Sequence, residues 1–245
     1  MNHQADAAII EQVLTELVEA ARGAFGTGLV SVVLFGSAAE GRLRATSDVN
    51  LMIVLERLEQ SALDAFREPL RAARAAIRAE VMMLTRAELQ IAAQLFPVKY
   101  SDMRARHRML AGPDPFERLE IPEADLRRQA REILMNTALR LRERYVRLSI
   151  HDEQLVPVIA DAAGALRSAA AAIARLAGQN ASSPREALTN LAAEAGAEYA
   201  AAVANLSRAR EAGTLSAGSA GATLLALSRL ATLLCERAGR SAARR

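Results

Sequence analysis

The chain has 245 residues, which is enough for one large domain or two modest ones, each with its own core. Hydrophobic residues make up 51% and charged residues 24%, a balance that excludes an intrinsically disordered chain. The formal net charge of +3 shows no block of like charge before the C-terminal tail, so nucleic acid is not an expected partner. The single cysteine, Cys235, excludes an intrachain disulfide framework and a cysteine zinc site.

Targeting and membrane signals are weak in this sequence. Residues 1–8 lack the basic and then apolar pattern of a secretory signal. The most apolar later stretch, 155–176, is mainly alanine and holds Asp161, Arg167 and Arg175, so we expect a buried bundle helix rather than a membrane span. These features predict a cytoplasmic protein with no membrane partner, and they leave a homodimer open.

Hydrophobic periodicity predicts alternating helices and strands in the first part of the chain. Two short runs, 29–35 and 48–55, are almost wholly apolar, which is typical of strands covered on both faces. Thr85 and Glu88 form a capping-box pattern at the start of a further helix. The expected elements are a helix over 7–24, strands over 29–35 and 48–55, a helix over 58–79, a strand over 80–84 and a helix from Thr85 to about Gln94.

The second half of the chain shows helical signals alone. Phe96-Pro97 ends the preceding helix, and residues 112–115, Gly-Pro-Asp-Pro, form a strong turn and a domain boundary. Short linkers between helices are typical of an antiparallel bundle. The expected helices cover residues 122–150, 155–177, 184–209 and 217–238. The sequence therefore predicts an α/β (α+β) domain with a small mixed sheet over 1–115, followed by an all-α helical bundle over 120–240.

The residues that can carry chemistry lie between the first two expected strands. Gly36 and Ser37 follow the first strand, where glycine lets the backbone approach a ligand and N–H groups with a hydroxyl can meet a phosphate. Asp48 and Asn50 point to the same face of the second strand, because side chains alternate along a strand. Two oxygen ligands at this spacing suit Mg²⁺ beside a triphosphate.

This stretch resembles the signature of the DNA polymerase β-like nucleotidyltransferase superfamily. That signature has a glycine-serine after the first strand, then a serine–aspartate–x–aspartate, and a third carboxylate on a later strand. Gly36, Ser37, Gly41 and Ser47-Asp48 match it. With its helical second half, the chain is similar in outline to small bacterial antibiotic-modifying enzymes such as kanamycin nucleotidyltransferase.

The resemblance implies a function and a set of cofactors. Members of the superfamily transfer a nucleoside monophosphate from a nucleoside triphosphate, such as ATP, to a hydroxyl, using Mg²⁺ or Mn²⁺. The acceptor here would be a small molecule or a protein side chain. The resemblance also implies that the helical part helps to hold this acceptor, in a cleft between the two parts.

One position departs from the signature. Asn50 stands where the second metal-binding aspartate is expected, and it offers a neutral carbonyl oxygen in place of a carboxylate. The missing charge weakens metal binding. Glu80 is the candidate for the third carboxylate by strand order, with a solvated charge at a helix–strand junction as the alternative. Residues 96–112 are similar to a group of bacterial nucleotidyltransferase-like proteins that also carry aspartate–x–asparagine, which implies that Asn50 is a feature of that group.

Two further residues and three functions remain open. Lys99, the one lysine of the chain, is either a phosphate contact or a surface side chain. His107 lies among arginines and is either a base or a surface histidine. The chain is a transferase, a catalytically impaired relative that serves as a nucleotide-binding or protein-interaction module, or a helical scaffold with a vestigial sheet. For the transferase, the expected catalytic and metal residues are Asp48, Asn50 and Glu80, and the expected nucleotide-binding residues are Gly36, Ser37 and Lys99.

Overall fold

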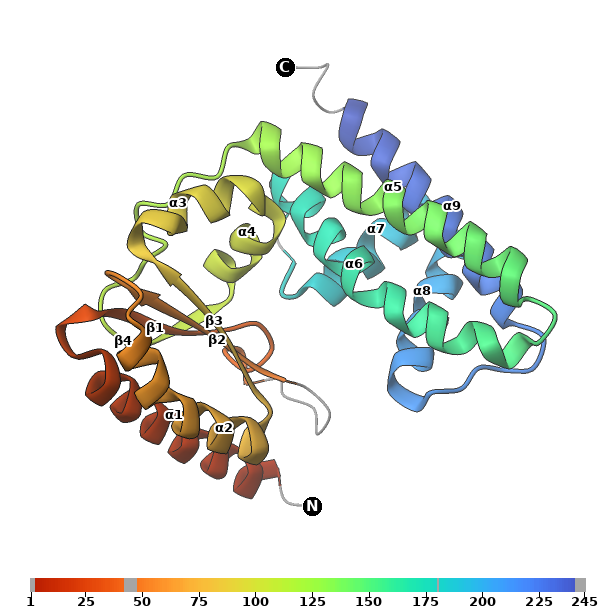
Figure 1. Ribbon diagram of the computed structural model, residues 1–245. Coiled ribbons are helices and arrows are strands. Elements are labelled where there is room, and N and C mark those ends of the chain that lie inside the picture. The colour runs from red at the N-terminus through yellow and green to blue at the C-terminus, as the bar shows by residue number, and fades with distance from the viewer. Residues whose placement is uncertain (1–2, 42–47, 180, 241–245) are drawn as a thin grey trace. The chain divides into compact units, whose positions relative to one another are not determined.

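The computed structural model describes residues 3–41, 48–179 and 181–240. They belong to two compact units, one formed by 1–96 with 100–121 and the other by 97–99 with 122–245. The first holds, in chain order, α1 (His3–Phe25), η1 (Gly26–Gly28), β1 (Leu29–Phe35), β2 (Val49–Leu55), α2 (Gln60–Ile77), β3 (Ala79–Thr85), α3 (Arg86–Leu95), most of α4 (Pro97–Ala105) and β4 (His107–Ala111) (Figure 1). The second holds the first turn of α4 and α5 (Glu123–Leu148), η2 (Asp152–Gln154), α6 (Leu155–Leu176), α7 (Pro184–Ala195), α8 (Ala197–Ala212) and α9 (Ala220–Arg240).

Within the described residues of the first unit, four strands form one sheet in the order β3-β2-β1-β4. β2 and β3 run parallel, whereas β1 is antiparallel to both β2 and β4. The sheet is therefore mixed and small, as the sequence predicts. The two central strands, β1 and β2, are the two runs that the sequence marks as almost wholly apolar, because each is covered on both faces.

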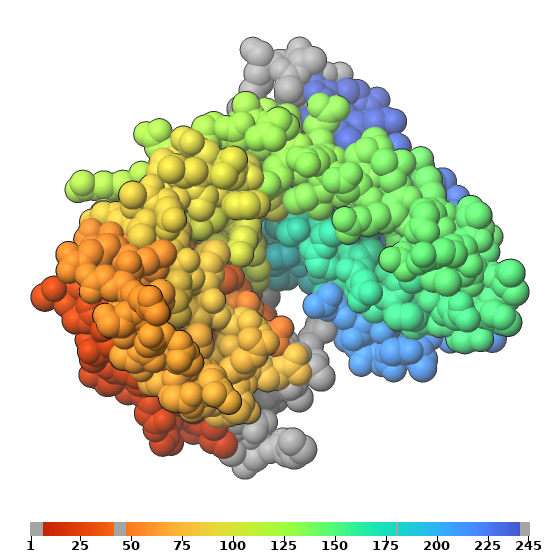
Figure 2. All heavy atoms as spheres, in the orientation of Figure 1, coloured from red at the N-terminus to blue at the C-terminus, as the bar shows by residue number. Residues whose placement is uncertain are grey.

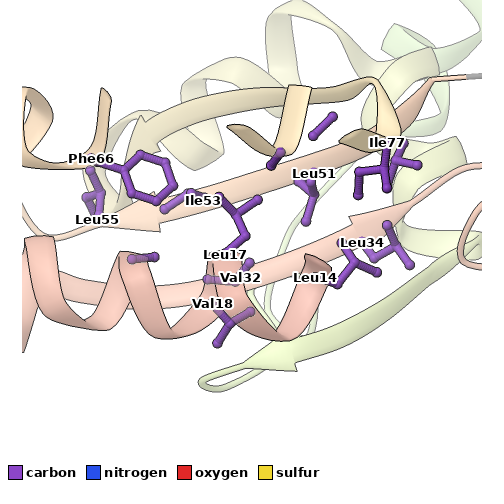
Figure 3. Packing of buried hydrophobic residues seen from close by; sticks show 14 residues of the cluster. Leu14, Leu17, Val18, Val32, Leu34, Leu51, Ile53, Leu55, Phe66 and Ile77 are labelled. Atoms are coloured by element: carbon purple, nitrogen blue, oxygen red, sulfur yellow. The ribbon is translucent and has the colours of Figure 1, made fainter. Parts of the chain in front are cut away.

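Helices cover the two faces of this sheet. α1 and α2 lie on one face (Figure 1). On that face the ring centroid of Phe66 lies 5.2 Å from that of Phe25. α3 and α4 contribute Leu89 and Tyr100 to the core on the other face. Burying each large apolar side chain stabilises the fold by roughly 1.5–3 kcal/mol. The residues labelled in Figure 3 belong to the first of these cores: Leu14, Leu17, Val18, Val32, Leu34, Leu51, Ile53, Leu55, Phe66 and Ile77.

The boundary between β3 and α3 confirms the expected capping box. The hydroxyl oxygen of Thr85 accepts from the N–H of Glu88 at 3.3 Å. The Glu88 carboxylate accepts from the N–H of Thr85 at 2.7 Å. Two N–H groups that the strand-to-helix junction leaves without partners are thereby satisfied.

The helical unit is built around α6. This helix packs against α5, α7, α8 and α9. With η2 it is long and apolar enough to cross a membrane by length and composition alone. Its Arg167 donates to the hydroxyl of Ser207 on α8 at 3.1 Å, and most of its alanines are buried among the other helices. α6 therefore has the packing of a bundle helix, as the sequence predicts.

One expectation for the helices needs correction, and two elements were not expected from the sequence. Residues 184–209 are not one helix, because Gly196 adopts φ +136° and separates α7 from α8. That backbone conformation is open to glycine and rarely to other residues. The sequence also gave no sign of α4 or β4. β4 has only five residues, and none of them is fully buried, so it lacks the apolar run that marks β1 and β2.

Candidate functional site

One end of the sheet brings the candidate residues of the first unit into line. Phe35, the last residue of β1, pairs with Asn50 on one side and with His107 on the other. Asn50 in turn pairs with Glu80 on β3. Gly36 follows Phe35 directly. The turn after β1 and the first residues of the other three strands therefore meet at one end of the sheet.

Strand alternation puts Asn50 and Glu80 on the same face. Asn50 shares its face of β2 with Met52, and Glu80 shares its face of β3 with Met82. Both methionines belong to the core that α3 and α4 cover. Asn50 and Glu80 lie at the strand ends, beyond the most buried part of that core, and are only half-buried.

Asp48, directly before β2, is ion-paired with an arginine that the sequence analysis did not single out. Its Oδ1 accepts from Nε of Arg78 at 3.0 Å and lies 2.9 Å from Nη2 of the same residue. The Asp48 side chain is 46% exposed. The side-chain amide of Asn50 donates to the main-chain carbonyl of Asp48 at 3.3 Å.

Glu80 is paired in the same way from the same helix. Its carboxylate lies 2.8 Å from Nη2 of Arg74, and its side chain is 45% exposed. Arg74 and Arg78 occupy the last turn of α2 and the residue that ends it. We refer to Asp48, Asn50, Arg74, Arg78 and Glu80 together as the sheet-end site. Two carboxylates and two guanidiniums give this site no net charge.

The donors of the sheet-end site do not fit a two-metal centre. Divalent hard cations are held by several carboxylate oxygens, whose negative charge offsets the ion. Here each of the two carboxylates is already paired with a guanidinium, and the third position is the neutral amide of Asn50. Within the described part of the chain, no group of three or more histidine, cysteine, aspartate or glutamate side chains could hold a metal ion.

Arg78 has an unusual backbone. It is the one residue other than glycine with positive φ among those the structure describes, with φ +55° and ψ +42°. This left-handed conformation costs a residue with a side chain about 1 kcal/mol, and helices usually end in it on glycine. The N–H of Arg78 donates to the carbonyl of Arg74, and its carbonyl accepts from the N–H of Val49. Because helices usually end on glycine in this conformation, an arginine at the end of an expected helix is the sequence signal that could have marked this residue.

The turn after β1 is tied to the start of β4. Gly36 has φ +77°, and its N–H donates to the carbonyl of Arg106 at 3.0 Å. Ser37 follows in the turn and is half-buried. Gly41 closes the turn by donating to the carbonyl of Ala38 at 3.1 Å. Ser47, the other residue of the signature, lies outside the described residues.

A second cluster, one arginine with two carboxylates, holds this turn in place. Arg106 donates through Nη1 to the carboxylate of Glu40 at 2.9 Å, and it forms a two-point ion pair with Asp102. All three side chains are less than 20% exposed. Burial by itself lowers the pKa of Arg106, but the hydrogen bonds and charges of Asp102 and Glu40 more than offset it and leave the pKa raised. We call Glu40, Asp102 and Arg106 the Arg106 clasp.

His107 has contacts of its own at the start of β4. Nε2 of His107 lies 3.2 Å from the carboxylate of Asp114 and its Nδ1 lies 3.0 Å from the carbonyl of Arg104. Its ring also stacks edge-on against Phe116. Those contacts tie the start of β4 to the following loop. Lys99 lies in the first turn of α4, which groups with the helical unit, and its side chain is exposed.

Comparisons with known proteins establish the fold. No protein-family model and no curated protein sequence matches the chain. Among solved structures, the chain is similar to the spectinomycin adenyltransferase AAD(9) from Enterococcus faecialis, crystallised with ATP and spectinomycin. The TM-score is 0.61 at 14% sequence identity, over 91% of this chain and 98% of that one. The chain thus has a nucleotidyltransferase-type fold followed by a helical region.

Proposed function

We propose that this chain binds a nucleoside triphosphate at the sheet-end site and is a catalytically impaired relative of the nucleotidyltransferases. The observation that carries the proposal is the register at one end of the sheet. It lines up the Gly36 turn, Asn50 and Glu80 on adjoining strands, and these are the residues that we match to the nucleotide and metal residues of the family signature. The fold is shared with an enzyme that was crystallised with ATP.

The impairment follows from the charge of the site. Asn50 removes one carboxylate, and the two that remain are paired with arginines. Each of these changes lowers the attraction for a divalent cation. Phosphate contacts depend less on those carboxylates, because they use N–H groups, hydroxyls and guanidiniums. Nucleotide binding is therefore the part of the nucleotidyltransferase reaction that the site supports best.

The test is calorimetric titration of ATP, GTP, CTP and UTP into the full chain, with localisation of any binding by hydrogen–deuterium exchange. We expect at least one triphosphate to bind and to slow exchange in the peptides that cover residues 29–41 and 48–55. Peptides from the end of the first helical turn of α9 onward, which belong to the other unit, serve as the internal control and should not change. A Kd weaker than about 1 mM, or −4 kcal/mol, for all four nucleotides contradicts the proposal.

A second candidate is transfer of a nucleoside monophosphate to a hydroxyl-bearing small molecule, with Mg²⁺ or Mn²⁺. It is favoured by the extent of the structural match, which covers the helical region as well as the sheet and reaches 98% of an adenyltransferase whose structure holds spectinomycin. In this function Asp48, Asn50 and Glu80 would be the metal and catalytic residues, and Gly36, Ser37 and Lys99 would contact the nucleotide.

The second candidate is tested by incubating the chain with an α-labelled triphosphate, Mg²⁺ or Mn²⁺, and either spectinomycin or a protein acceptor. Label transfer with release of pyrophosphate supports it. The Asn50→Asp variant adds the carboxylate that the family signature carries. Transfer by that variant alone would identify a decayed enzyme, and transfer by the wild type would show that Asn50 is a working ligand.

A further inference from the structure

The arginines of the sheet-end site are open to a ligand. The side chains of Arg74 and Arg78 are 67% and 59% exposed. The outer face of α2, in orange to amber, lies on the open surface of the first unit (Figure 2). Exposed ion pairs contribute little to stability, so a ligand of higher negative charge can displace the carboxylates or share the guanidiniums with them.

Arg78 holds a backbone conformation that is strained for any residue with a side chain. Glycine fits the left-handed conformation at φ +55° without strain, and its main chain could make the same hydrogen bonds to Arg74 and Val49. The side chain of Arg78 is not needed for core packing, since it is mostly exposed. Among the described residues, the side chain of Arg78 pairs with Asp48, and an exposed ion pair of this kind adds little stability to set against the strain. Strained residues of this kind cluster where a ligand binds.

The geometry of the pair leaves donors available. Asp48 uses Nε and Nη2 of Arg78, both through the single oxygen Oδ1. A guanidinium has five N–H donors, so three of those on Arg78 are not used by Asp48. Asp48 then orients the planar group, and the guanidinium can still present a fork of N–H groups to a phosphate.

We propose that Arg78, assisted by Arg74, binds the phosphates of the nucleotide directly, so that binding at the sheet-end site does not require a divalent cation. When the phosphates displace the carboxylates of Asp48 and Glu80, the two guanidiniums supply positive charge at the place where the family would use metal ions. This explains three features at once: the strained arginine, the neutral amide of Asn50 where the family signature has a carboxylate, and the pairing of Glu80 with Arg74. The inference rests on the proposed function, because it assumes that a nucleoside triphosphate is the ligand.

The test compares triphosphate binding in excess EDTA with binding in Mg²⁺, using calorimetry and all four nucleotides. We expect the wild type to bind in EDTA with a Kd within about tenfold of that in Mg²⁺, a difference of at most about 1.4 kcal/mol. Binding in Mg²⁺ with loss of more than about a hundredfold in EDTA would overturn the metal-independent mode and leave the proposed function standing. No binding under either condition would overturn both.

Two substitutions of Arg78 separate binding from folding. Arg78→Gly relieves the backbone strain and Arg78→Ala keeps it, so the glycine variant should have the higher Tm. Both should weaken triphosphate binding in EDTA by at least about tenfold, because both lose the guanidinium. Arg71→Ala is the matched control: it removes an exposed arginine of α2 that pairs with Glu68, and it should leave binding unchanged. Unchanged binding in both Arg78 variants would overturn the role of this residue.

Discussion

Two clusters of arginine and carboxylate lie at the same end of the sheet and differ in burial. In the Arg106 clasp, Glu40, Asp102 and Arg106 are each less than 20% exposed. In the sheet-end site the carboxylates of Asp48 and Glu80 are 46% and 45% exposed. A buried guanidinium without its partners is costly, whereas an exposed one is solvated. The same residue types therefore hold a turn in place in one cluster and remain open to exchange with a ligand in the other.

The largest expected effect is the loss of stability in Arg106→Ala. This change leaves the carboxylates of Asp102 and Glu40 mostly buried without their cation, and it should lower the free energy of unfolding by about 3 kcal/mol. Denaturant unfolding followed by circular dichroism measures it. Arg22→Ala is the control, since Arg22 pairs with Glu19 on an exposed helix surface and its loss should change stability by less than about 1 kcal/mol. Equal effects of the two changes would remove the distinction between clasp and surface pair.

The next effect concerns charge rather than stability. Asn50→Asp adds a carboxylate beside Asp48 and Glu80, and it should tighten Mn²⁺ binding by about tenfold through the added Coulomb attraction. Calorimetry or the paramagnetic relaxation of Mn²⁺ gives the affinity. Asn190→Asp adds the same charge at an exposed position of α7 and should have no effect.

The opposite result for Asn50→Asp would also be informative. If the variant bound Mn²⁺ no better than the wild type, the ion pairs with Arg74 and Arg78 would be the main barrier to a metal ion. Combining Asn50→Asp with Arg78→Ala would then show whether removing one guanidinium allows the ion to bind.

A matched pair of glutamates sharpens the comparison further. Glu40→Gln and Glu80→Gln each remove one carboxylate from an arginine, in the clasp and in the sheet-end site. We expect Glu40→Gln to lower the free energy of unfolding by about 1.5 kcal/mol, as for a hydrogen bond to a charged group. Glu80→Gln should change it by less than about 0.5 kcal/mol. Denaturant unfolding of both variants under one set of conditions measures the difference, and a larger effect at Glu80 would contradict the assignment of that site as exchangeable.

The central strands and the cap of α3 could be predicted from the sequence, whereas α4 could not, although it buries Tyr100. The apolar runs of β1 and β2 and the capping box of Thr85 with Glu88 carry local signals, and the mixed sheet follows from their order. The ion pair of Asp48 with Arg78 has no such signal, because it joins exposed side chains 30 residues apart. Hydrophobic periodicity indicates which side chains are buried, but it does not indicate which exposed side chains form ion pairs. For that reason the positions of Asp48, Asn50 and Glu80 could be proposed from sequence, while the arginines that neutralise the carboxylates could not.

The smallest expected effect is at the other end of β3, where an exposed carboxylate is held by hydrogen bonds instead of an arginine. The pKa of Glu88 is lowered, chiefly by the hydrogen bond from the main-chain N–H of Thr85 and then by the one from its hydroxyl. Because the folded-state pKa is depressed, the stabilisation is present above the ordinary glutamate pKa of about 4.3 and is lost as the pH falls through the lower folded value.

Thr85→Ala removes only the hydroxyl, so it should move the pKa of Glu88 part of the way back toward its ordinary value. NMR titration of the Glu88 side-chain carboxyl measures this, with Thr15→Ala on the exposed surface of α1 as a control that leaves the midpoint unchanged. A wild-type midpoint at or above the ordinary value would show that the capping box does not act on this charge. A depressed midpoint would show that a main-chain donor can hold an exposed carboxylate, a role that the sheet-end site gives to arginines able to change partner.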